Sequence, residues 1–268
     1  MSFEYLLILA MVQGLTEFLP VSSSGHLVLL PYFLGEADQG QMIDVALHMG
    51  TLLAILVYYI RDFWFIAVSF LKWNDQGLAA GRRLGMNIVV ATVPAVIVGY
   101  ALHEIYPEGI RSVPLIAANI IVFGVVMGLA DRFGQKNKTI ADVHFKSAFI
   151  MGLAQALALV PGVSRSGVTM SAGRFLGFNR SDAARVSFLM GTPAMFGAGL
   201  LDLKDVVENG ATDALHDAAI AAGLSFVFGF AAIHFMMRWL QRFGLMPFVV
   251  YRLALGLFLI FYLMEKTG

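Results

Sequence analysis

One polar segment interrupts the apolar start of the chain: Gln13-Gly14-Leu15-Thr16-Glu17-Phe18-Leu19-Pro20-Val21-Ser22-Ser23-Ser24-Gly25-His26. It places a carboxylate, an imidazole and several hydroxyls between apolar residues that begin at Tyr5 and the run Leu27-Val28-Leu29-Leu30. Polar and ionisable groups at bilayer depth are costly and usually mark functional sites. Pro20 ends the first helix, and the serines suit the N-cap of a helix that resumes near Gly25. We therefore expect two half-length helices with a polar tip between them.

The composition is typical of a polytopic helical membrane protein. Of the 268 residues, 59% are hydrophobic and 13% are charged, and the mean hydropathy is +0.77. Soluble domains carry only about 45–50% apolar residues. Long continuous apolar runs indicate helices, because the strands of a membrane barrel alternate in polarity. The chain has no cysteine, which excludes disulfides and thiol chemistry. We expect an all-α membrane domain over residues 1–268, with no nucleic acid as a partner.

Eight apolar regions divide the chain. Two of them, 3–35 and 147–177, break in the middle at Leu19-Pro20 and at Pro161-Gly162. A break at membrane depth is tolerated only where it is buried in protein or lines a water-filled cavity, so we expect two re-entrant helical hairpins. The other six are long enough to span a bilayer, and they are 42–60, 87–103, 114–131, 184–201, 218–237 and 247–264.

An internal repeat relates the two broken regions. A shift of 142 residues aligns Tyr5 to Gly35 with the second region without a gap, and it pairs Gln13 with Gln155. The same shift pairs Ser22 with Ser164 and Ser24 with Ser166. Each half, about 3–131 and about 147–264, then contains a re-entrant hairpin and three spans. Because three is odd, the second half is expected to be inverted relative to the first, as in many transporters.

The basic residues predict the orientation. If the odd-numbered spans end on one face, that face collects most of the lysines and arginines, including Lys136. The opposite face holds only Arg111, Lys204 and Lys266. By the positive-inside rule the basic face is cytoplasmic and both termini are extracytoplasmic. The first hairpin would then enter from outside and the second from the cytoplasm, so that their tips meet near the midplane.

The second tip indicates an anion site. Ser164, Arg165 and Ser166 precede a helix expected to begin near Gly167. The N-terminus of a helix offers free N–H groups and a positive dipole end, and an arginine binds phosphate through two N–H groups at once. Phosphate is the favoured ligand, because a carboxylate would use Arg165 less fully.

The first tip adds groups that a passive anion site does not need. Glu17 with Gln13, one turn earlier, suits a divalent cation that bridges phosphoryl oxygens. His26 suits a general base or acid, and a serine suits a nucleophile that it activates. The residues do not decide between attack by a serine and direct attack by water.

These motifs resemble the signatures of the undecaprenyl-diphosphatase family, the bacitracin-resistance membrane phosphatases of bacteria. The resemblance rests on Gln13-x-x-x-Glu17, on Leu19 to His26 and on Pro161 to Thr169, and it extends over most of the chain. It implies hydrolysis of undecaprenyl diphosphate to the monophosphate and inorganic phosphate on the outer side of the bacterial inner membrane. This reaction recycles the cell-wall lipid carrier and confers bacitracin resistance.

The resemblance also implies roles for single residues. The family has Glu or Gln at the position of Gln13. A divalent cation, Mg²⁺ or Ca²⁺, is implied, with Glu17 and Gln13 as ligands. Catalysis is implied for Glu17, Ser23, His26 and Arg165. Diphosphate binding is assigned, from the residues and the resemblance together, to Ser22, Ser24, Ser164, Arg165, Ser166 and Thr169.

A second function stays open at this point. Inverted repeats with broken helices also describe transporters, and a flippase for a polyprenyl phosphate would need the same anion-binding tips. Glu17 and His26 beside the phosphate site favour the enzyme. The sequence leaves both a monomer and a homodimer open.

Overall fold

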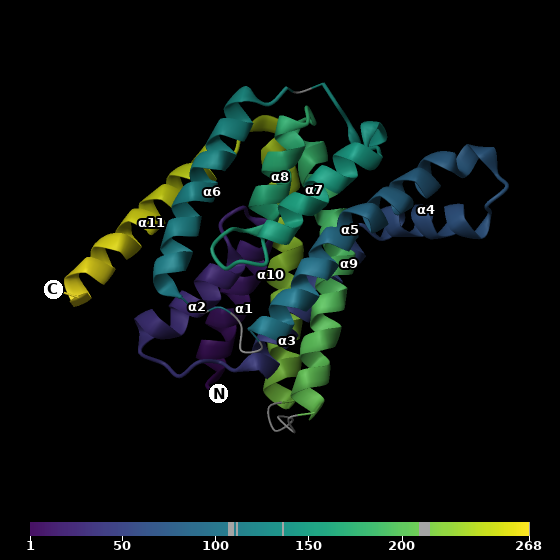
Figure 1. The fold of residues 1–268 in the computed structure, drawn as a ribbon. Helices are drawn as coiled ribbons and strands as arrows, with labels where there is room; N and C mark the ends of the chain where they lie inside the picture. Colours follow the sequence, from purple (N-terminus) through teal and green to yellow (C-terminus); the bar gives the residue numbers. More distant parts are fainter. Residues whose placement is uncertain (107–109, 111, 136, 209–214, 268) are drawn as a thin grey trace.

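The computed structural model describes residues 1–106, 110, 112–135, 137–208 and 215–267 (Figure 1). The described part of the chain is helical, apart from its connecting segments, so the predicted all-α class is confirmed. Arg111 and Lys136, which the orientation prediction uses, lie outside these residues. The helices are α1 (Phe3–Phe18), α2 (Ser23–Leu34), α3 (Gln41–Tyr58), α4 (Ile60–Leu71), α5 (Ala79–Ile105), α6 (Val113–Phe133), α7 (Phe145–Leu157), α8 (Arg165–Phe175), α9 (Arg180–Glu208), α10 (Leu215–Arg242) and α11 (Met246–Thr267), with short 3₁₀ turns η1 (Gln76–Leu78) and η2 (Ile140–Asp142).

Among the described residues, six helices are long and apolar enough to cross a membrane, as predicted. They occupy Gln41–Tyr58, Gln76–Ile105, Val113–Phe133, Arg180–Lys204, Leu215–Arg242 and Met246–Glu265. The chain is therefore a multi-pass helical membrane protein. The predicted span 87–103 lies within α5, which continues toward its N-terminus through Arg82 and Arg83. The two arginines donate hydrogen bonds to the backbone carbonyls of Asp75 and Ala141. These bonds hold the N-terminal part of α5, which precedes the predicted span, in place.

Both predicted breaks are present. The first separates α1 from α2 at residues 19–22, and the second separates α7 from α8 at residues 158–164. Each returning helix begins two residues earlier than predicted, at Ser23 and at Arg165. The reason is that Ser22 and Ser164 take the N-cap positions with φ of +80° and +73°, and they are the two non-glycine residues of the described chain with positive φ.

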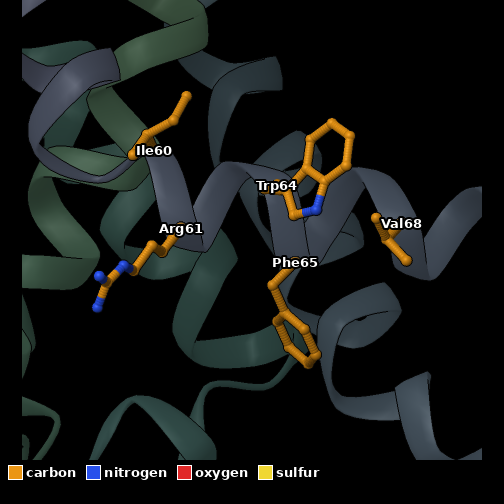
Figure 2. A pocket seen from close by; sticks show the side chains of 5 residues that line it. All are labelled: Ile60, Arg61, Trp64, Phe65 and Val68. Atoms are coloured by element: carbon orange, nitrogen blue, oxygen red, sulfur yellow. The ribbon is translucent and has the colours of Figure 1, made fainter.

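Helix α4 is an element that the sequence did not predict. Figure 1 shows it projecting from the body beside the first part of α5. Its outer side carries large exposed apolar residues, with Trp64 at 68% and Leu71 at 82% exposure. Figure 2 shows the side chains of Trp64 and Phe65 standing away from the helix, beside a shallow hollow of about 350 Å³. A short helix with one apolar face and aromatic residues is typical of segments that lie in the membrane interface.

The two halves of the chain are interleaved. Helix α1 packs against α10 of the other half, and α7 packs in the corresponding way against α5. Helices α3 and α9 pack against each other, and α6 lies beside α11 on one flank (Figure 1). The contact of α7 with α5 is close, because a Cβ on Gly152 would lie 2.5 Å from the carbonyl oxygen of Ala91. This packing brings the two breaks together.

Candidate active site

The two tips meet through one ion pair. Glu17 lies in the last turn of α1, and Arg165 is the first residue of α8. Arg165 Nη2 donates to Glu17 Oε1 at 2.8 Å, although the residues are 148 positions apart. The side chains are 7% and 14% exposed. Gly191 of α9 makes room for the guanidinium, because a Cβ at this position would collide with Arg165.

The second oxygen of Glu17 accepts two hydrogen bonds. Ser23 Oγ donates to Glu17 Oε2 at 2.6 Å, and Gln13 Nε2 donates to the same oxygen at 3.1 Å. The predicted one-turn spacing of Gln13 and Glu17 is therefore present as a direct contact. A hydroxyl bonded to a carboxylate that can take its proton is the arrangement of an activated nucleophile. Ser23 is only partly buried, as are Ser24 and His26.

His26 faces two partners other than Ser23. Its Nδ1 lies 2.7 Å from the backbone carbonyl of Ser22, and its Nε2 lies 2.7 Å from the hydroxyl of Tyr251. Because a carbonyl only accepts, Nδ1 carries the proton and Nε2 accepts from Tyr251. The two rings are also stacked, with centroids 5.8 Å apart. Sequence reasoning missed Tyr251, because only the fold brings α11 to the first tip.

Arg252, the next residue of α11, donates hydrogen bonds to backbone carbonyls of both breaks and of α6. It is fully buried. Nη2 donates to the carbonyl of Gly162 at 2.8 Å, and Nη1 lies 3.4 Å from the carbonyl of Pro20. Nε and Nη2 also reach the carbonyls of Ile120 and Asn119, each at 3.1 Å. The guanidinium therefore satisfies backbone groups that the two breaks leave without helical partners.

Further groups near the ion pair were also missed. The backbone carbonyl of Ser187, on α9, lies 3.5 Å from Arg165 Nη1. Met195 of α9 accepts from Arg165 Nη2, with Sδ at 3.0 Å. Such contacts lie between helices far apart in sequence, and the sequence carries no local signal for them.

The hydroxyls predicted to bind diphosphate are mostly used by the protein itself. Ser164 Oγ caps α8 by accepting from the N–H of Gly167 at 3.1 Å. Ser166 Oγ donates to the carbonyl of Leu19 at 3.2 Å, which is a second contact between the tips. Thr169 Oγ1 donates to the carbonyl of Arg165 at 2.6 Å. Ser22 and these three residues are buried, whereas Ser24 is partly exposed. Diphosphate binding by these hydroxyls stays a prediction.

Several buried polar atoms at the tips have no hydrogen-bond partner. They are Gln13 Oε1, Ser22 Oγ and both amide atoms of Gln155. Buried polar groups are nearly always satisfied by protein, water or a ligand, so these atoms mark places where a polar ligand fits. The two glutamines are the pair that the repeat relates. Gln155 holds the position in the second half that Gln13 holds in the first, so the repeat could have identified it as a candidate site residue. Sequence reasoning assigned it no role.

The donor set at the first tip fits a cation that is shared with a phosphate ligand. Gln13 Oε1 is an oxygen without a partner, and hard cations such as Mg²⁺ and Ca²⁺ prefer oxygen ligands. Glu17 is the adjacent carboxylate. Among the described residues, no group of three His, Cys, Asp or Glu side chains is placed to hold a metal ion alone. A cation here would therefore need further oxygens from a phosphate ligand or water.

Comparison with known proteins agrees with these features. A relative named undecaprenyl-diphosphatase from Maricaulis maris is 45% identical over 264 residues, covering 97% of this chain and 98% of the relative. Relatives of the same name from Erythrobacter litoralis and Ruegeria pomeroyi are each 44% identical, covering 96% and 97% of this chain and 98% of each relative. The sequence model described as bacitracin resistance protein BacA matches residues 6–258. The chain therefore belongs to the bacitracin resistance protein BacA family.

Proposed function

We propose that the protein is an undecaprenyl-diphosphate phosphatase, which releases inorganic phosphate from the lipid diphosphate and leaves the monophosphate. The observation that carries this proposal is the contact between the tips, in which Glu17 binds Arg165 through one oxygen and Ser23 through the other. This contact brings together Arg165 as the phosphate-binding cation, Glu17 as the base and Ser23 as the nucleophile. The shared name of relatives that are 44–45% identical over nearly the whole chain supports the substrate.

The contacts support a two-step reaction. Ser23 Oγ attacks the terminal phosphorus and its proton passes to Glu17 Oε2, 2.6 Å away. The bond between this phosphorus and the bridging oxygen breaks, and the lipid monophosphate leaves with the electron pair. Water then hydrolyses the phosphoserine and regenerates Ser23. The unprotonated Nε2 of His26 takes the proton of that water once Tyr251 gives up its hydrogen bond.

Arg165 and the start of α8 stabilise the transferring phosphoryl group. Its guanidinium exchanges Glu17 for phosphoryl oxygens, which carry more charge and suit its paired N–H groups. The N–H groups of the first turn of α8 point toward the same tip and add a positive dipole end. Ser24 is the one residue among the predicted phosphate-binding hydroxyls that is not buried. A divalent cation, Mg²⁺ or Ca²⁺, held by Glu17 and Gln13, would neutralise phosphoryl charge when bound.

We further propose two inverted repeats, each with a re-entrant hairpin and three spans, in the bacterial inner membrane. The support is the equivalence of Ser22 and Ser164, which share an unusual positive φ, and the matching packing of α1 on α10 and of α7 on α5. The distribution of basic residues supports extracytoplasmic termini and a site that opens outward. Recycling of the cell-wall lipid carrier and bacitracin resistance follow from this reaction. A homodimer stays a prediction that light scattering in detergent would check.

Phosphate release by the purified protein tests the function. Undecaprenyl diphosphate in detergent should yield inorganic phosphate, whereas Glu17→Ala and Arg165→Ala should yield almost none. A flippase with the same anion site would instead move a polyprenyl phosphate across vesicle membranes without releasing phosphate. Lipid movement in the absence of phosphate release would therefore refute the phosphatase.

A further inference from the structure

An apolar groove lies between α5 and α9, which run side by side in Figure 1. Its volume is about 430 Å³. Small residues line it from both sides: Ala95 and Gly99 on α5, and Ala194, Gly197 and Ala198 on α9. Leu159, from the break between α7 and α8, lines it as well. The groove thus includes a residue of the second tip.

Arg165 and the groove contact the same face of α9. Gly191, against which the guanidinium lies, is followed on the same face of α9 by Ala194 and Ala198, three and seven residues later. Met195, whose sulfur accepts from Arg165, is the neighbour of Ala194. A molecule with its phosphate on Arg165 therefore has an apolar path along α9 beside the phosphate.

The lining selects for a hydrocarbon chain. The polar residues of the groove, Tyr100, His103 and Asp202, lie toward the C-terminal ends of α5 and α9. Asp202 is eleven residues beyond Gly191, which contacts Arg165. The part near the tip offers aliphatic surface and small residues that leave room for methyl branches. We propose that this groove binds the isoprene units next to the diphosphate of the substrate. The inference rests on the proposed function and adds the place where the lipid chain enters the site.

If the groove binds the lipid, kcat/KM should depend on the length of the substrate's hydrocarbon chain. Burial of one methylene group strengthens binding about fourfold. Extending the substrate from five carbons (isopentenyl diphosphate) to fifteen (farnesyl diphosphate) should therefore raise kcat/KM by at least about tenfold, even with partial burial. Inorganic phosphate release from both compounds, in the same detergent, gives the ratio of the two kcat/KM values.

Two substitutions fill the groove from opposite walls. A Cβ on Gly197 would meet nothing within 4 Å, so Gly197→Leu places its side chain in open space. A Cβ on Gly99 would lie 3.6 and 3.8 Å from the methyl carbons of Leu159, which is ordinary contact, so Gly99→Leu fits as well. Gly223→Leu on α10 is the matched control, because its Cβ also meets nothing and it does not line the groove.

The expected result is that both groove variants lose the tenfold preference for farnesyl diphosphate and hydrolyse isopentenyl diphosphate at the wild-type rate. The control should keep the preference. If the groove variants keep the preference too, the groove holds ordinary bilayer lipid and the inference is wrong. An equal loss with both substrates also overturns it, because the substitutions would then act on the site itself. If the wild type hydrolyses neither these compounds nor undecaprenyl diphosphate, the proposed function fails first.

Discussion

Replacement of Arg252 by methionine should separate activity from stability. The guanidinium lies wholly inside the protein and reaches four backbone carbonyls, at 2.8 to 3.4 Å. Two of them belong to the breaks, at Pro20 and Gly162. The described chain pairs Arg252 with carbonyl dipoles and with no carboxylate. Arg252→Met keeps an unbranched apolar side chain and removes every donor.

The effect on stability should be small, because two opposing contributions nearly cancel. Each carbonyl that is left unsatisfied costs about 1–3 kcal/mol, and the 3.4 Å contact is weak. In the opposite direction, burial of a guanidinium without an anionic partner costs several kcal/mol, which the methionine removes. We therefore expect the free energy of unfolding to change by no more than about 2 kcal/mol.

The effect on activity should be much larger. Without Arg252 the two breaks lose a common anchor, and a displacement of about 1 Å at a reacting group costs about 100-fold in rate. This corresponds to about 2.7 kcal/mol in the activation free energy. The assay is kcat for phosphate release at saturating substrate, together with Tm in detergent. A variant that keeps kcat within threefold of the wild type would show that the tips do not depend on Arg252.

Arg174 provides the matched control. It is also fully buried and donates to the carbonyls of Gln135, Gly134 and Phe178, but it has an anionic partner, Asp131, whose Oδ1 lies 3.6 Å from Arg174 Nε, and it lies at the far end of α8 from the tips. Arg174→Met should lower Tm and leave the kcat of the folded protein within about threefold, because its partners do not include the breaks. Equal losses of kcat in both variants would mean that global loosening, and not the position of the tips, limits the reaction.

Four further predictions concern the reaction. Glu17→Gln keeps the shape of the side chain and removes the base, so kcat/KM should fall about 10²–10⁴-fold; retention of a tenth of the phosphate release would contradict this role. A rapid-quench digest during turnover should contain phosphoserine at Ser23, and its persistent absence would favour direct attack by water. Tyr251→Phe keeps the ring stack and leaves Nε2 of His26 free to act as a base, so kcat should be kept or rise by up to about tenfold, the worth of one hydrogen bond, with KM unchanged; a fall in kcat would show that the hydroxyl of Tyr251 itself takes part in the reaction. Chelation of divalent cations should abolish phosphate release, and added Mg²⁺ or Ca²⁺ should restore it; full activity in the chelator would remove the cation from the proposal.

The sequence was sufficient to predict the elements that local chemistry determines. Apolar length identifies the six spans, and Pro20 and Pro161 mark the two breaks. The repeat places Glu17 and Arg165 at the tips, and the structure brings them to 2.8 Å. Helix α4 was missed, because its twelve residues are too few to span a bilayer and its apolar face merges with the preceding span.

The contacts that complete the site were beyond prediction for a different reason. A serine near a tip can cap a helix, donate to a carbonyl or bind a ligand. The residue type alone does not distinguish these roles. Ser164 and Ser166 use their hydroxyls within the protein, whereas Ser23 faces Glu17. Tyr251 and Arg252 reach the tips only because α11 packs beside α6. Such roles depend on tertiary packing, which one sequence does not show.

The ion pair between the tips also explains how two buried charges are tolerated without the substrate. Glu17 and Arg165 neutralise each other at 2.8 Å, so neither is left as an uncompensated charge in an apolar setting. A diphosphate that binds Nη2 of Arg165 takes the place of Glu17, because this group donates to the carboxylate in the structure. The carboxylate is then released from its cationic partner while it still holds the hydroxyl of Ser23. Because loss of the cation makes a carboxylate a stronger base, substrate binding itself would activate the nucleophile. The site would thus be inactive toward water until a phosphate arrives.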